Sequence, residues 1–114
     1  MKLISVAPFM VCISMQAIAA PIPAADAASH VGQSATVEGT VSEVYTSRRG
    51  DTFIDMNGTY PNETFSGVIF ADEASAVGDV HSLENKTIRL TGTIQTYRGR
   101  PEIIVKSRGQ IAVP

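Results

Sequence analysis

The sequence predicts an all-β domain with one short helix, in the order β-β-β-α-β-β. Apolar and polar residues alternate along several short segments, as half-buried strands require, and turn-forming residues separate these segments. Two of the segments, "VEGTV" at 37–41 and "LTGTI" at 90–94, place a glycine where an inward side chain is expected. A glycine inside a strand is typical of a sharp bend. Closing five short strands into a small barrel requires such strongly coiled strands.

Residues 1–19 have the features of a secretory signal peptide. Lys2 is followed by an apolar run without charge, and "AIA" at 17–19 supplies the small-x-small pattern that signal peptidase reads. We expect cleavage after Ala19 or Ala20. A membrane anchor is the alternative, but the run is short and Pro8 interrupts it, so we expect no stable membrane insertion after cleavage.

Composition limits the chemistry of the exported domain. The only cysteine, Cys12, lies in the leader, where Val11 before it argues against a lipid-modified cysteine. The mature chain would have no disulfide and must rely on an ordinary hydrophobic core. The net charge of −2 becomes −3 when Lys2 is removed, so the surface as a whole is unsuited to gripping nucleic acid. The short leader and the cysteine-free domain favour a bacterial protein, either periplasmic or secreted.

Residues 20–30 are rich in alanine and proline and are predicted to form a tether, with the folded domain at 31–114. The first strand begins near Val31, and its alternation slips by one residue near Ser42-Glu43, which predicts a bulge. A turn at 47–51 leads to a second strand, 52–56. The dense turn sequence 57–64 leads to a third strand, 65–70.

The segment 71–86 interrupts the strand pattern. Asp72 is a candidate N-cap for a short helix through about Val77, and Gly78 is a candidate stop. A fourth strand is predicted at 87–97 and a fifth at 101–107, followed by a short extension, "GQIAV".

This progression resembles the OB-fold, a five-stranded Greek-key barrel, and specifically its nucleic-acid-binding-like group. The most specific part is "LTGTIQTYRGRPEIIV" at 90–105, which is similar to the closing hairpin of OB domains in anticodon-binding and nuclease-associated proteins. The resemblance covers about residues 31–113. It implies that the loops joining strands one to two and four to five flank one groove, which runs across strands two and three.

The arginines are concentrated at the two loops that the resemblance places beside the groove. Arg48 and Arg49 would lie on one side, Arg98 and Arg100 on the other, with Tyr45 and Tyr97 near the rim. Such a basic clamp beside aromatic rings suits stacked bases and a phosphate chain. Ordinary solvated turns explain the same residues, because charges at hairpin tips also discourage aggregation.

The floor of the groove depends on which face of each strand points outward. If Ile54 and Met56 point inward, Phe53 points outward. If Val68 and Phe70 point inward, Phe65 likewise points outward. A register error of one residue would instead bury either phenylalanine in the core. Asp55 would face outward, and its negative charge argues against a groove floor that binds a polyanion. We expect Glu102 to pair with Arg100 or Arg98.

The sequence favours a binding protein over an enzyme. His30 and His81 have no second ligand at metal spacing, and no catalytic constellation stands out, so we expect no metal and no cofactor. The resemblance implies single-stranded nucleic acid as the partner. The alternative is a module that binds a protein or an oligosaccharide in the same groove, because fold analogy does not choose between ligands.

Overall fold

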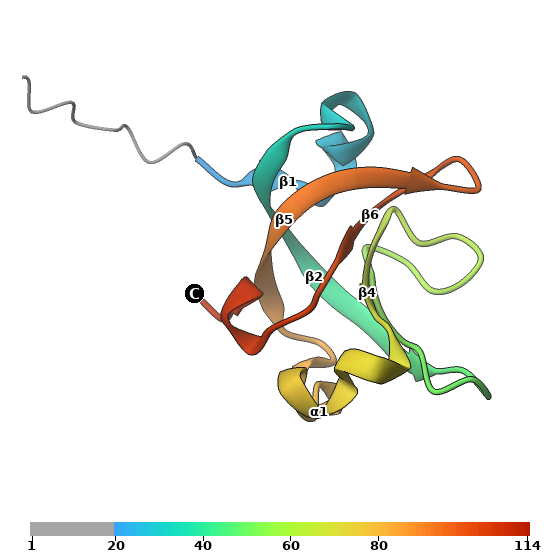
Figure 1. The fold of residues 1–114 in the computed structure, drawn as a ribbon. Coiled ribbons are helices and arrows are strands. Elements are labelled where there is room, and N and C mark those ends of the chain that lie inside the picture. The colour runs from blue at the N-terminus through green and yellow to red at the C-terminus, as the bar shows by residue number, and fades with distance from the viewer. Residues whose placement is uncertain (1–19) are drawn as a thin grey trace, which may run out of the picture.

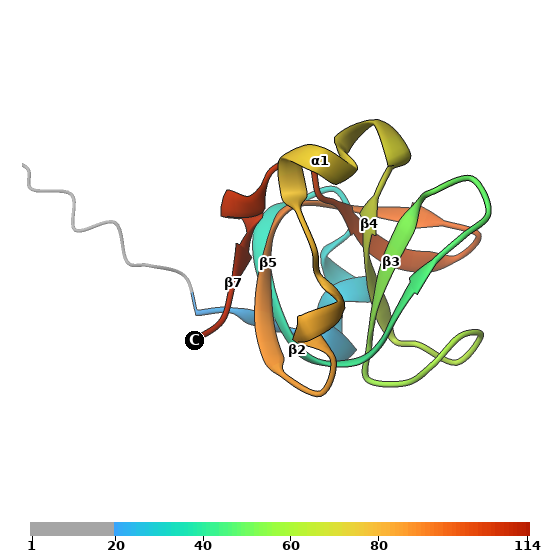
Figure 2. The ribbon, with the colours of Figure 1, turned by 90° about the horizontal axis from the view of Figure 1, so that it is seen from below.

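The computed structural model describes residues 20–114; the predicted signal peptide, residues 1–19, lies outside the described part. Five strands form a closed barrel, in which β2 pairs with β3, β3 with β4, β4 with β6, β6 with β5, and β5 again with β2 (Figures 1 and 2). All these pairings are antiparallel except β4–β6. This is the OB-fold that the sequence predicts. The barrel strands are β2 Ser34–Thr46, β3 Thr52–Met56, β4 Phe65–Ile69, β5 Thr87–Tyr97 and β6 Arg100–Ile104.

Strand β2 closes the barrel because it belongs to both of its sides. Its first half, Ser34 to Thr40, pairs with β5, and its second half, Val41 to Thr46, pairs with β3. The register shifts between Val41 and Glu43, which confirms the predicted bulge. At the bulge, the backbone N–H of Val44 donates to the Glu84 carboxylate at 3.0 Å rather than to a strand. The bend therefore keeps its backbone groups satisfied while the strand changes direction.

Short helical segments surround the barrel. The predicted helix forms as a 3₁₀ turn that leads into α1, and it ends at Gly78, whose φ of 78° suits glycine. Asp72 is not its cap. Instead, the Asp51 carboxylate accepts from the backbone N–H of Ala71 at 2.9 Å. The segments between β4 and β5 are η2 Ala71–Glu73, α1 Ala74–Val77 and η3 His81–Leu83.

Both ends of the described chain add to the barrel. Strand β1, Ile22–Pro23, pairs in parallel with β2, and the 3₁₀ helix η1, Ala24–His30, buries Ala24 and Ala27 in the core. The prediction of a tether at 20–30 was therefore wrong. The segment packs through small alanine side chains, and it lacks the periodic large apolar residues by which a buried element is usually recognised in a sequence. After the 3₁₀ turn η4, Arg108–Gln110, strand β7, Ile111–Ala112, pairs with β5.

The face that β4 turns to the core was also predicted wrongly. Phe65 is fully buried and Phe70 is exposed, so Phe65 belongs to the core and does not line the groove. Apolar residues lie on both faces of this strand, which left its phase ambiguous. Gly67 settles the phase, because it lets Leu90 pack against the β4 backbone: a Cβ on Gly67 would lie 2.6 Å from Leu90 Cδ1.

Gly39 and Gly92 occupy positions where the core leaves no room for a side chain. A Cβ on Gly39 would lie 2.8 Å from Met56 Sδ and 3.0 Å from Ala24 Cβ. A Cβ on Gly92 would lie 2.7 Å from Ile103 Cγ2. The barrel strands therefore approach their neighbours through these glycines.

We predict that Gly39→Val and Gly92→Val each lower the free energy of unfolding by more than about 1 kcal/mol, because the added side chain overpacks the core. Gly109→Val is the matched control: nothing lies within 4 Å of its Cβ, so a change within about 0.5 kcal/mol is expected. Urea unfolding of the three variants measures the effect. Equal stabilities for all three would contradict the close approach at Gly39 and Gly92.

Candidate ligand-binding groove

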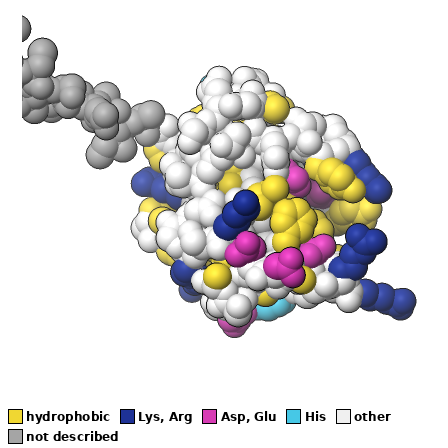
Figure 3. All heavy atoms as spheres, viewed as in Figure 1, with side chains coloured by type: hydrophobic (Ala, Val, Ile, Leu, Met, Phe, Trp, Pro, Cys, Tyr) yellow, Lys and Arg dark blue, Asp and Glu magenta, His cyan; other side chains and the backbone are white. Residues whose placement is uncertain are grey.

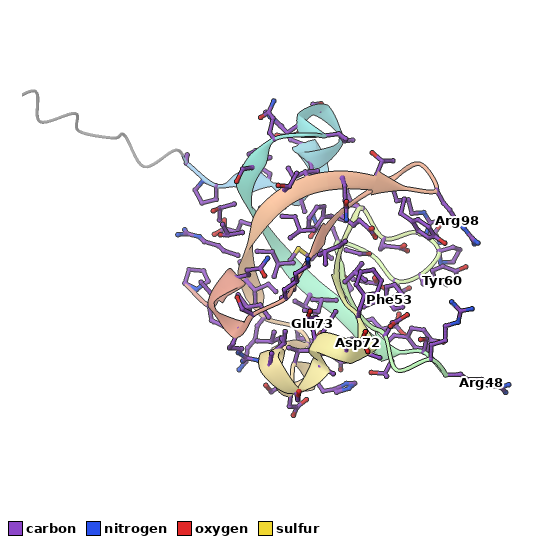
Figure 4. All side chains as sticks on the ribbon, in the orientation of Figure 1. Arg48, Phe53, Tyr60, Asp72, Glu73 and Arg98 are labelled. Carbon is purple, nitrogen blue, oxygen red and sulfur yellow. The ribbon has the colours of Figure 1, made fainter. Side chains whose placement is uncertain are left out.

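A groove of about 830 Å³ lies on the outward face of the barrel, between the β5–β6 hairpin and the loop that joins β3 to β4. Figure 3 shows hydrophobic, acidic and basic side chains gathered on this side of the molecule, and Figure 4 shows Phe53, Tyr60 and Arg98 there. Its lining residues are Glu43, Tyr45, Phe53, Asp55, Tyr60, Glu63, Ser66, Tyr97, Arg98, Arg100, Pro101 and Glu102. Neither Arg48 nor Arg49 lines it.

The strand register arranges the floor in rows. One row crosses four strands through successive partners: Glu43 pairs with Asp55, Asp55 with Ser66, and Ser66 with Glu102. We call its three carboxylates, Glu43, Asp55 and Glu102, the acidic row. Two residues further along β2 and β3, Tyr45 pairs with Phe53. The groove floor is therefore acidic, with an aromatic row beside it.

Aromatic rings flank the acidic row on both sides. Tyr45 and Phe53 stack with ring centroids 6.2 Å apart and planes inclined by 23°. Across the row lie Tyr97, with the Arg98 guanidinium 5.3 Å from its ring centroid, and Tyr60, with the Arg100 guanidinium 5.6 Å from its centroid. The three tyrosines keep half or more of their surface exposed, so their rings are accessible to a ligand.

Arg100 forms an ion pair with Glu63. The sequence had suggested a pair with Glu102 instead. The Arg100 guanidinium donates to the Glu63 carboxylate, whose side chain is only 7% exposed. The other oxygen of this carboxylate, Oε2, is buried and has no hydrogen-bond partner among the described residues. This ion pair joins the β5–β6 hairpin to the loop between β3 and β4.

Burial dominates the electrostatics of the floor. Asp55 is 3% exposed, and burial, reinforced by the like charges of Glu63 and Glu43, raises the pKa of its carboxyl to about 6. A hydrogen bond donated by the Ser66 hydroxyl to Asp55 Oδ1, at 2.8 Å, and the charge of Arg100 oppose this rise in pKa. Burial also raises the pKa of Glu102.

Arg98 occupies a backbone position that arginine seldom adopts. It forms the two-residue hairpin turn with Gly99, and both have positive φ, 50° and 78°. Such a turn favours asparagine, aspartate or glycine at its first position. A side chain kept at a conformational cost points to a role for that side chain.

The structure brings five of the predicted site residues to the groove: Tyr45, Phe53, Tyr97, Arg98 and Arg100. Arg48 and Arg49 are exposed at the β2–β3 tip, where Arg48 extends away from the groove (Figure 4). Tyr60 and Glu63 were missed because the turn signal of residues 57–64 concealed them. An aromatic residue in a loop between the two floor strands was the available signal.

In residues 20–114, no group of three or more histidine, cysteine, aspartate or glutamate side chains is placed to hold a metal ion. No helix in that range is long and apolar enough to cross a membrane.

We predict that Asp55→Asn removes a pH dependence of stability. Because the folded-state pKa of about 6 lies above the ordinary 3.8, protonation favours folding: the stabilisation is full below pH 3.8 and is lost as pH rises through 6. Relative to Asp55→Asn, the wild type should lose roughly 1–3 kcal/mol of unfolding free energy across that range. Urea unfolding at a series of pH values measures it, with exposed Asp72→Asn as control. If the difference in unfolding free energy between the wild type and Asp55→Asn stays constant with pH, the prediction is wrong.

The barrel has a counterpart among solved structures, although no protein-family model and no curated protein matches the sequence. A protein assigned as an aspartyl-tRNA synthetase from Leishmania major Friedlin superimposes with a TM-score of 0.53 and 12% identity. The match covers 89% of this chain and 22% of that one, so it corresponds to about a fifth of the larger protein. At this identity the likeness concerns the fold alone.

Proposed function

We propose that this chain is a non-catalytic OB-fold binding protein that holds single-stranded nucleic acid in the groove. The observation that carries the proposal is a groove on an OB barrel with accessible aromatic rings on both sides and arginines at its rim. Bases stack on such rings whatever their sequence, with about 1–3 kcal/mol for each base. The barrel also resembles part of a protein named as a tRNA synthetase, which is compatible with a nucleic-acid ligand.

The charges determine how the strand would lie. The acidic row repels phosphate, so the backbone cannot run along the floor. Arg98 at one hairpin tip, and Arg48 and Arg49 at the other, are exposed and free to meet phosphates outside the groove. We therefore place the bases inward, against the rings, and the phosphates outward.

The strained position of Arg98 supports the same arrangement. Asparagine would suit its positive φ better, yet the chain places there a long cation beside an exposed tyrosine. A guanidinium stacked on Tyr97 presents its remaining donors outward, where a phosphate can accept them.

Binding of an oligosaccharide or a peptide is the second candidate, and the acidic row favours it. Carboxylates accept hydrogen bonds from sugar hydroxyls or from peptide amines, and sugar rings stack on tyrosine. Salt distinguishes nucleic acid from an oligosaccharide, because phosphate contacts weaken steeply as salt rises and contacts with an uncharged sugar do not.

We further propose that the protein is exported to a bacterial periplasm or secreted. Cleavage after Ala19 or Ala20 would leave Ile22, the first residue of β1, in place to pair with β2. Removal of the leader would therefore leave every described element of the domain intact.

The expected processing is checked by N-terminal sequencing of protein from the native host. The mature chain should begin at Ala20 or Pro21 and be found outside the cytoplasm. An intact Met1 on protein in a membrane fraction would contradict export and favour an anchor.

The binding proposal is tested with Arg98→Asn and a labelled oligothymidylate of about eight nucleotides, a length within the usual site size of an OB domain. The variant should match or exceed the wild type in stability, because asparagine suits the turn. It should bind several-fold more weakly, and the slope of log affinity against log salt should fall by about one. Arg48→Ala/Arg49→Ala should lower the slope by about one to two.

Lys106→Ala is the matched control, because Lys106 is exposed and does not line the groove. It should leave the salt slope unchanged. Alanine at Arg100 is unsuitable for this purpose, since it would also leave the buried Glu63 unpaired. If the wild type shows no binding to any oligonucleotide at low salt, the nucleic-acid proposal is wrong. Salt-independent binding of an oligosaccharide would then support the second candidate.

A further inference from the structure

The floor of the groove offers a ligand mainly hydrogen-bond acceptors, whereas the tyrosine hydroxyls and Arg98 supply donors around it. This floor holds the acidic row and, beside it, the Glu63 carboxylate. Two nearby donor groups are directed at carboxylates, because the Ser66 hydroxyl donates to Asp55 and one N–H of the Arg100 guanidinium donates to Glu63. Among the described residues, nothing donates to Asp55 Oδ2 or to the buried Glu63 Oε2.

Unpartnered acceptors of this kind select for donors, and Asp55 Oδ2, unlike Glu63 Oε2, is not among the fully enclosed atoms. A buried polar atom without a partner costs free energy, and a ligand that supplies the missing hydrogen bond removes that cost. A ligand group that brings another acceptor against the floor would add repulsion. Asp55, a residue that is 3% exposed, and Glu63, whose side chain is 7% exposed, are both held largely out of water.

The four DNA bases differ in what their edges offer to a carboxylate. Guanine presents two adjacent donors, N1–H and N2–H, which two carboxylate oxygens can accept. Adenine and cytosine place one amino donor beside a ring-nitrogen acceptor, and thymine places one N–H between two carbonyl acceptors. Single-stranded bases are read on these edges when they stack on aromatic side chains.

The register brings the stacking surface and the carboxylates within reach of one base. Tyr45 and Phe53 lie two residues along their strands from Glu43 and Asp55, a separation of about 7 Å. A base stacked on this aromatic pair would therefore lie within reach of the acidic row. Glu102, half-buried and across Ser66 from Asp55, lies in the same row toward Tyr97.

We propose that the groove selects guanine over the other bases, with Asp55 and Glu102 of the acidic row accepting from its N1–H and N2–H. This inference rests on the proposed function, since it names the base that the same groove prefers. Arg98, Arg48 and Arg49 hold any strand by its phosphates, and the acidic row on the floor distinguishes the bases.

Fluorescence anisotropy with matched oligonucleotides tests the proposal on the wild-type protein. Replacing one central thymine of an oligothymidylate of about eight nucleotides by guanine should raise affinity about fivefold or more, the effect of a good pair of hydrogen bonds to one base. A single guanine also avoids self-association of the strand. Hypoxanthine at the same position lacks the N2 amino group and should lose most of this gain. Adenine or cytosine there should give less than guanine.

The double variant Asp55→Asn/Glu102→Gln keeps the side-chain sizes but gives each position a donor and only one acceptor oxygen. Its preference for guanine over thymine should fall to within about twofold, whereas the matched variant Asp72→Asn/Glu73→Gln should keep it. Asp72 and Glu73 lie on η2 (Figure 4), and neither of them lines the groove. The control removes the same two charges, so a general electrostatic gain would appear in both variants.

The outcomes separate this inference from the function on which it rests. Equal affinities for guanine and thymine strands, or a guanine gain that hypoxanthine retains, would overturn the preference and leave nucleic-acid binding standing. Absence of binding to every strand at low salt would overturn both. The hypoxanthine comparison needs no variant, so the preference remains testable even if the double variant does not fold.

Discussion

The closure of the barrel through β2 is the constraint on which the rest of the structure depends. One strand of 13 residues pairs with β5 along its first half and with β3 along its second, and it bends between them. Closure brings the β2–β3 and β5–β6 hairpins, which are about fifty residues apart in the sequence, to the same side of the molecule (Figures 1 and 2). It also requires close strand contacts, which Gly39, Gly67 and Gly92 permit. The groove exists because the barrel closes.

Much of this fold could be predicted from local patterns, because strands with one buried face alternate clearly. The bounds of β3 and β5 and the bulge of β2 followed from alternation alone. Two predictions failed where the pattern was locally ambiguous. Apolar residues on both faces of β4 hid the burial of Phe65, and the alanines of η1 lacked the size that marks a core segment. The contact of Arg100 with Glu63 depends on where a loop folds back, which no local pattern encodes.

The groove combines charges that work against each other. Its floor carries carboxylates that burial holds partly out of water, while its rim carries exposed cations. In a nucleic-acid site this division assigns separate tasks, since phosphates are attracted to the rim and excluded from the floor. A uniformly basic groove would hold the backbone in many registers. An acidic floor allows only arrangements in which the bases point inward.

The two ends of the described chain leave the barrel on the side opposite the groove. Ala20 precedes β1, Pro114 follows β7, and both of these short strands lie at the edge away from the two hairpin tips (Figures 1 and 2). Attachment through either end, to a sensor surface, a fluorescent fusion partner or a second copy in tandem, therefore leaves the groove open. In a tandem array, the connection would not obstruct either groove. Two weak sites joined in this way bind a long strand far more tightly than either site alone.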